Sequence, residues 1–128
     1  MGAWDSKPWD CDGASDWFGD LFDDTDLADR VSAAFDADPE DAHEEIRAAA
    51  ALVSMLCRTY VWPVDKIDAV LDVAIDKLRQ VAAMEIYADS PELVATVRGE
   101  IALLESRIDG REWDQDAAAA VWRSWLSD

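Results

Sequence analysis

The chain has 128 residues, about half of them apolar, and its 29 acidic side chains against 11 basic ones give a net charge of −18. A field of that sign repels nucleic-acid phosphates and anionic membranes, so we expect neither as a partner and favour a basic protein. No apolar run approaches membrane-spanning length and no secretory signal opens the chain, so we expect a soluble, cytoplasmic protein. The length fits one domain over residues 1–128.

The charge is concentrated near the N-terminus. Residues 1–45 hold 15 acidic side chains and only two basic ones, Lys7 and Arg30, which gives this part a charge of −13. Aspartate outnumbers glutamate by 21 to 8, a bias typical of surfaces adapted to high salt, where charge repulsion is screened. A proteome that prefers arginine and alanine gives a similar bias, so both explanations stay open.

The first helix is expected to follow an extended arm. Residues 1–11 show no helical period and are expected to pack on the remaining chain through Trp4 and Trp9. Asp12 is expected to cap the helix by accepting a hydrogen bond from a first-turn N–H group. Trp17 heads the apolar stripe and should be buried. The stripe comprises Ala14, Trp17, Phe18, Leu21 and Phe22.

Two further helices are predicted in the next part of the chain. A short one covers residues 27–35, where apolar side chains recur at helical spacing. Asp38-Pro39-Glu40 then starts a third helix with a cap, a proline at the first position and an acidic residue at the positive end of the helix dipole. Its apolar stripe reaches Tyr60, and Trp62-Pro63 is expected to end it.

The last part of the chain predicts three more helices. One opens near Asp65 and runs to about Val81, and another begins at Ser90-Pro91-Glu92 and closes at Asp109-Gly110. The final helix follows Trp113. No long segment alternates with period two, so we predict an all-α fold: a compact bundle of five to six helices with an extended N-terminal arm.

Asp10, Asp12 and Asp16 lie in a run that resembles a calcium-binding loop. It fails the EF-hand pattern, because Gly13 stands at the fourth position and no glutamate closes a twelve-residue loop. Capping and dipole stabilisation account for Asp12 and Asp16 without a metal. The acidic residues between positions 20 and 26 are interpreted as solvated surface. We therefore predict no metal site and no cofactor.

His43 is the only histidine, and it lies among charged residues on the polar face of the third predicted helix. With no second histidine, cysteine pair or neighbouring serine, zinc sites and hydrolytic triads lack parts, so we interpret His43 as a surface residue. Trp122 and Trp125 on the last helix are interpreted as core residues, with an exposed partner patch as the alternative. Cys11 and Cys57 are interpreted as free thiols, and a bridge between them stays open.

The N-terminus resembles the family named domain of unknown function (DUF) 4259, which opens M-G-[AT]-W-G-x-G-x-F-x-N-D-x-A-x-D-[WFY]. The matching residues are Met1, Gly2, Ala3, Trp4, Asp12, Ala14, Asp16 and Trp17. Residues 48–51 and 90–93 also look like later features of the family. Departures occur at Asp5, Lys7, Trp9 and Cys11. The resemblance implies a small helical fold and a motif of Trp4, Asp12, Asp16 and Trp17 with a structural or binding role, and it brings no known activity.

The leading functional prediction is a non-enzymatic protein-binding module that uses its acidic N-terminal half. An inhibitor or immunity-like role against a basic, nucleic-acid-acting protein suits the charge. The alternative is a divalent-metal-dependent enzyme with Asp10, Asp12 and Asp16 as ligands, which is disfavoured because no general base or nucleophile accompanies them. A structural or dimeric protein without a small ligand is a third possibility. We predict no catalytic residue.

Overall fold

The computed structural model describes residues 7–9, 11–110 and 112–126, and over these ranges the fold is all-α, as predicted. They contain seven α-helices, two short 3₁₀ turns and no strand. The elements are α1 (Asp12–Thr25), α2 (Leu27–Ala34), α3 (Pro39–Leu56), η1 (Val64–Lys66), α4 (Ile67–Ala83), α5 (Glu85–Ala88), α6 (Pro91–Ser106), η2 (Ile108–Gly110) and α7 (Gln115–Leu126). None of the described helices is long and apolar enough to cross a membrane.

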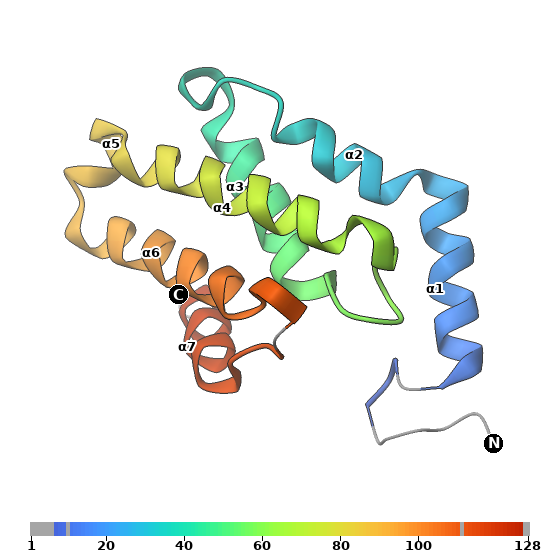
Figure 1. The fold of residues 1–128 in the computed structure, drawn as a ribbon. Helices are drawn as coiled ribbons and strands as arrows, with labels where there is room; N and C mark the ends of the chain where they lie inside the picture. The colour runs from blue at the N-terminus through green and yellow to red at the C-terminus, as the bar shows by residue number, and fades with distance from the viewer. Residues whose placement is uncertain (1–6, 10, 111, 127–128) are drawn as a thin grey trace.

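The core lies between the three long helices α3, α4 and α6. α4 packs against both α3 and α6, and α7 packs against α6 (Figure 1). Each of the three turns an apolar stripe toward the others, which removes those side chains from water and supplies the main favourable term for folding. Their fully buried side chains include Ile46, Val53, Leu71, Leu78, Val81, Val97, Leu103 and Leu104.

α1 contributes little to this core and lies at the edge of the molecule (Figure 1). Its one fully buried residue is Phe22, whose ring meets the edge of the Trp62 ring at a centroid distance of 5.2 Å. The helix ends at Asp26, which adopts a left-handed conformation with φ of 52°. Aspartate tolerates that conformation better than most residues, and it lets α2 begin at the next position. Most of the circumference of α1 therefore faces solvent.

The two strongest predicted helix starts are confirmed. The Asp38 carboxylate accepts a hydrogen bond of 3.0 Å from the backbone N–H of Glu40 at the start of α3. The Ser90 hydroxyl accepts one of 3.3 Å from the N–H of Leu93 at the start of α6. In both helices the next residue is proline, which has no N–H group that would need a partner there.

Asp12 does not cap α1, so this prediction is wrong. Cys11 occupies the cap position with extended backbone and makes no side-chain capping bond, and Asp12 is the first helical residue. Its carboxylate lies in the first turn, where its negative charge interacts favourably with the positive end of the helix dipole.

The third helix ends at Leu56, earlier than the stripe to Tyr60 predicts. If the helix continued, its geometry would place Trp62 opposite Val53, on the solvent side. The turn after Cys57 instead buries Trp62 to 2 % exposure and leaves Tyr60 exposed at φ of 74°. Burial of the larger indole outweighs continuation of the stripe.

Other boundaries also differ from the sequence prediction. The four-residue α5 raises the number of described helices to seven, above the five or six expected. α4 begins at Ile67 after the turn η1, and α6 ends at Ser106, with Asp109 in the following turn η2. Residues 1–6 and 10, which carry most of the predicted arm, lie outside the described residues.

Candidate functional site

The outer side of α1 carries a row of aspartates that we call the acidic face: Asp12, Asp16, Asp20, Asp23 and Asp24. All five are exposed, and their spacing of three to four residues places them on one side of the helix. α1 contains no lysine or arginine, and no ion pair to these residues occurs in the described part of the chain. Within the described ranges, no ion pair offsets the negative charge of this surface.

Trp17 flanks the acidic face and is 61 % exposed, so the prediction that it is buried is wrong. It touches Phe18 edge-on at a ring-centroid distance of 5.4 Å. Trp17 and the buried Phe22 are five positions apart, which is about 140° around a helix. An edge helix buries only a narrow strip of its circumference, and α1 buries the strip that contains Phe22.

Only part of the predicted motif lies within the described residues. Trp4 and Asp10 lie outside the described residues, and Asp12 and Asp16 are exposed one turn apart on α1. In the described ranges, no group of three or more histidine, cysteine or acidic side chains is arranged to hold a metal ion. Cys11 and Cys57 are free thiols, so the two do not form a bridge.

A groove runs beside α1, and sequence reasoning missed it. We call it the α1 groove; it has a volume of about 430 Å³ and lies between α1 and residues 59–64. Gly19 adds no side chain to the α1 wall of the groove, and a Cβ at this position would have no other atom within 4 Å. Trp62 lines the groove, and its buried indole N–H has no hydrogen-bond partner among the described residues. A smaller pocket of about 90 Å³ adjoins it and is lined by Asp23, Asp26 and Asp29 among others.

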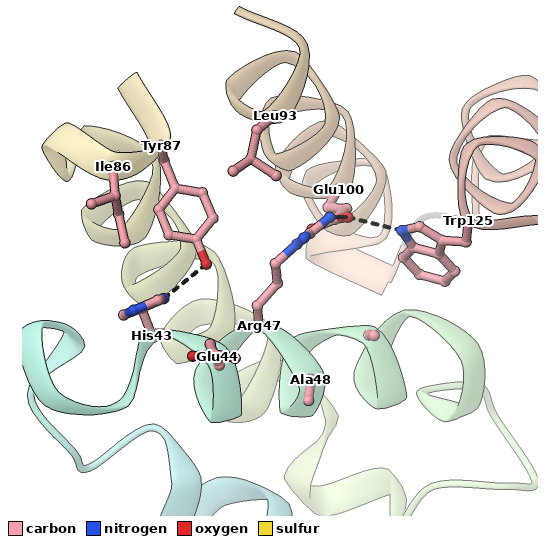
Figure 2. Close-up of a pocket in the computed structure, with 10 residues that line it drawn as sticks. His43, Glu44, Arg47, Ala48, Ile86, Tyr87, Leu93, Glu100 and Trp125 are labelled. Atoms are coloured by element: carbon pink, nitrogen blue, oxygen red, sulfur yellow. Dashed lines mark hydrogen bonds and ion pairs between the residues drawn. The ribbon is translucent and has the colours of Figure 1, made fainter. Parts of the chain in front are cut away.

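A second cavity, of about 590 Å³, opens where α3, α5, α6 and α7 meet (Figure 2). We call it the α3–α6 pocket. His43 Nδ1 and the Tyr87 hydroxyl share a hydrogen bond of 2.9 Å at one end. His43 is half-buried, so its interpretation as a surface residue is wrong. Apolar side chains cover much of the remaining lining: Ala48, Ala51, Ile86, Leu93 and Trp125.

The centre of this pocket is a buried carboxylate with three donors. Glu100 is 5 % exposed, and Arg47 donates to it through Nε at 3.0 Å and Nη2 at 2.7 Å. The indole N–H of Trp125 donates to Glu100 Oε2 at 2.9 Å (Figure 2). The bond to Glu100 raises the pKa of Arg47. The ion pair therefore joins α3, α6 and α7 with its charges satisfied.

Two pairs of polar side chains in the α3–α6 pocket, His43–Tyr87 and Arg47–Glu100, are hydrogen-bonded to each other. Burial raises the pKa of Tyr87, so its phenol stays protonated at neutral pH. The described residues that line the pocket include no serine, threonine or cysteine that would act as a nucleophile. Its polar groups bond to one another, which fits a role in holding the helices together.

A cluster of aromatic rings around Arg58 joins the two ends of the chain, and no sequence signal predicts it. The guanidinium carbon lies 4.6 Å from the Trp9 ring centroid, 5.8 Å from that of Trp113 and 5.9 Å from that of Trp122. Burial lowers the pKa of Arg58, and the nearby Arg107 lowers it further. Cation–π attraction and a hydrogen bond of 3.2 Å from Arg58 Nε to the Met55 carbonyl stabilise this half-buried charge. Trp122 and Trp125 are half-buried, so they are neither fully core nor an open patch.

Comparisons with family models, with curated proteins and with solved structures find no match to this chain. The resemblance of the N-terminus to the DUF 4259 family therefore stays a prediction. The functional argument rests on the surfaces described above.

Proposed function

We propose that this protein is a non-enzymatic binding module that captures a basic protein through the acidic face of α1. The observation that carries the proposal is the exposure of Trp17 beside that face. Asp20 and Asp24, three and seven positions later, share its side of the helix. A large aromatic ring exposed among uncompensated carboxylates suits a partner that presents arginine or lysine.

Electrostatics support this choice of partner. The acidic face supplies five of the 15 acidic side chains in residues 1–45, and the charge of −13 on this part of the chain draws a basic protein in from a distance and speeds encounter. A basic partner also relieves repulsion between neighbouring carboxylates, so binding strengthens the helix that makes the contact. Nucleic-acid-acting proteins have basic surfaces of this kind, and an inhibitor or immunity-like role follows if binding covers such a surface.

Trp17 adds an apolar anchor to a contact that would otherwise depend on charge attraction alone. Tryptophan is enriched among residues that dominate binding energy, because it combines a large apolar area with few rotatable bonds. An arginine side chain can stack on the indole while its guanidinium meets Asp20 or Asp24. Burial of Trp17 on binding also removes the exposure of a large apolar ring in the free protein.

The test compares variants of equal charge change. A fluorescent helical peptide of lysine and leucine serves as the basic probe at physiological salt, and anisotropy reports its binding. D16N/D20N/D24N is expected to weaken binding by about tenfold, or roughly 1.4 kcal/mol. The matched control D72N/D76N/D89N neutralises three exposed aspartates, two in α4 and one directly after α5, outside the acidic face. It should change affinity by less than about twofold.

Trp17→Ala is expected to weaken the same binding by more than about tenfold, as loss of a central aromatic anchor does. Equal losses for the two aspartate triplets, together with no effect of Trp17→Ala, would show attraction by net charge without a defined surface. That result would reject the proposal.

A further inference from the structure

The α1 groove and its acidic continuation form a two-part channel along one flank of α1. The first part is lined mainly by apolar side chains, with Phe22 and Trp62 in edge contact. The second is lined by three aspartates, and it shares Phe22, Asp23 and Pro63 with the first. An apolar chamber and a smaller chamber lined largely by carboxylates therefore adjoin at these shared residues.

The side chains on the two walls of the apolar chamber leave room for a further apolar side chain. Gly19 and Ser15 present almost no side chain on the α1 wall, so space remains open there. On the opposite wall, Tyr60 and Val64 are exposed, at 47 % and 73 %.

We infer that this channel binds the anchor of the partner: an apolar side chain followed by lysine or arginine on one basic segment. The apolar side chain fills the chamber beside Gly19, and the basic side chain reaches the aspartates of the second chamber. This inference rests on the proposed function, because it concerns the same acidic partner-binding helix. It adds an apolar requirement that the acidic face alone does not impose.

The charge pattern of the channel favours this occupant over a second copy of the chain. Asp23, Asp26 and Asp29 are exposed, and Lys66 is the one base lining their chamber in the described chain, paired with Asp29 at 2.8 Å. A second copy would bring further carboxylates against them, since the protein carries −18. A basic segment supplies the opposite charge.

The test uses two helical peptides of equal positive charge, one of lysine and leucine and one of lysine and glutamine. Wild-type protein should bind the leucine peptide about tenfold more tightly, as burial of one aliphatic side chain provides. Gly19→Leu should abolish this preference, because the new side chain occupies the chamber. The substitution meets no atom at its Cβ and replaces glycine within a helix, so the fold is retained.

Gly13→Leu is the matched control, because Gly13 is also an α1 glycine with open space and lies outside the groove lining. It should keep the tenfold preference. A preference that survives in Gly19→Leu, or is absent in wild type, overturns the inference while leaving the acidic face intact as a binding surface. Unchanged binding of both peptides in D16N/D20N/D24N instead overturns the proposed function.

Discussion

Carboxylates serve opposite purposes in two regions of this molecule. On α1 five aspartates are exposed without an ion-pair partner in the described chain, on a helix that buries one residue fully. In the α3–α6 pocket one carboxylate, Glu100, is buried and accepts three hydrogen bonds from two side chains. A satisfied buried charge fixes helix positions, whereas a row of unsatisfied exposed charges remains available to a partner. This contrast underlies the proposal that the pocket stabilises the fold and that α1 binds the partner.

The largest expected contrast is in cysteine reactivity. Burial raises the pKa of Cys57 to about 12, so its thiol is neutral at pH 8, whereas Cys11 at the start of α1 is only half-buried. Cys57 should react with iodoacetamide at least about a hundredfold more slowly than Cys11, measured by mass spectrometry of the alkylated peptides.

The same shift predicts how stability depends on pH. The unfolded thiol ionises near pH 9 and the folded one near 12, so the contribution of Cys57 is fully present below pH 9 and is lost as pH rises toward 12. A Cys57→Ala variant should show a shallower loss of unfolding free energy in this range. An identical slope in wild type and variant would contradict the assignment.

Tryptophan truncation should next distinguish the buried Trp62 of the α1 groove from the exposed Trp17 beside the acidic face. Trp62→Ala removes a buried ring that packs on Phe22 and should lower the unfolding free energy by about 3–5 kcal/mol. Trp17→Ala should cost less than about 1 kcal/mol, because most of the ring already faces water. Urea denaturation measures both, and a large cost for Trp17→Ala would indicate a structural role for this residue.

Breaking the buried ion pair should cost about 3 kcal/mol, because Glu100→Ala leaves Arg47 without its partner. Replacing both residues, as in Arg47→Leu with Glu100→Leu, should recover most of that loss. If the double variant is no more stable than Glu100→Ala, the pair does not act as a unit.

Helix starts offer a smaller contrast. Asp38→Ala removes an observed cap and should cost about 1 kcal/mol. Asp12→Ala should cost about 0.3–0.5 kcal/mol, since Asp12 acts only through the helix dipole. Thermal denaturation of both variants at the same salt concentration measures the difference, and equal costs would show that the side chain of Asp12 does cap α1 in solution.

The smallest expected effect concerns repulsion on the acidic face. D16N/D20N/D24N removes three like-charge pairs at a spacing of four residues and should stabilise the protein by about 0.6–1.5 kcal/mol in dilute buffer. The gain should disappear in molar salt, which screens the same repulsion in wild type and raises its melting temperature. A wild-type melting temperature that stays flat or falls with salt would contradict this account.

Patterns local in sequence predicted much of the fold. Asp38-Pro39 and Ser90-Pro91 set helix starts through hydrogen bonds made within a few residues, so the local sequence predicts where these helices begin. The local sequence does not predict where α3 ends, because that end depends on burying Trp62 against Phe22, forty positions earlier in the chain. Periodicity predicts the apolar stripe on α1 but not which part of the stripe faces the core, so it wrongly predicts that Trp17 is buried.

The candidate sites show the same division. The acidic face follows from the sequence once α1 is predicted, because spacing alone places its aspartates on one side. The partners of Arg47 and Arg58 lie far along the chain, at Glu100 and Trp125 for the first and at Trp9, Trp113 and Trp122 for the second. A single sequence gives no signal for contacts across such separations, and the α1 groove depends on a turn that was expected to be helix.

The most direct test of the central claim is hydrogen–deuterium exchange of the protein with and without the lysine–leucine peptide. Binding at the acidic face and the adjoining groove should slow exchange of amides in α1 and in residues 59–64, while amides of α5, α6 and α7 stay unchanged. Protection confined to the helices around the α3–α6 pocket, with none in α1, would contradict the assignment of binding to α1.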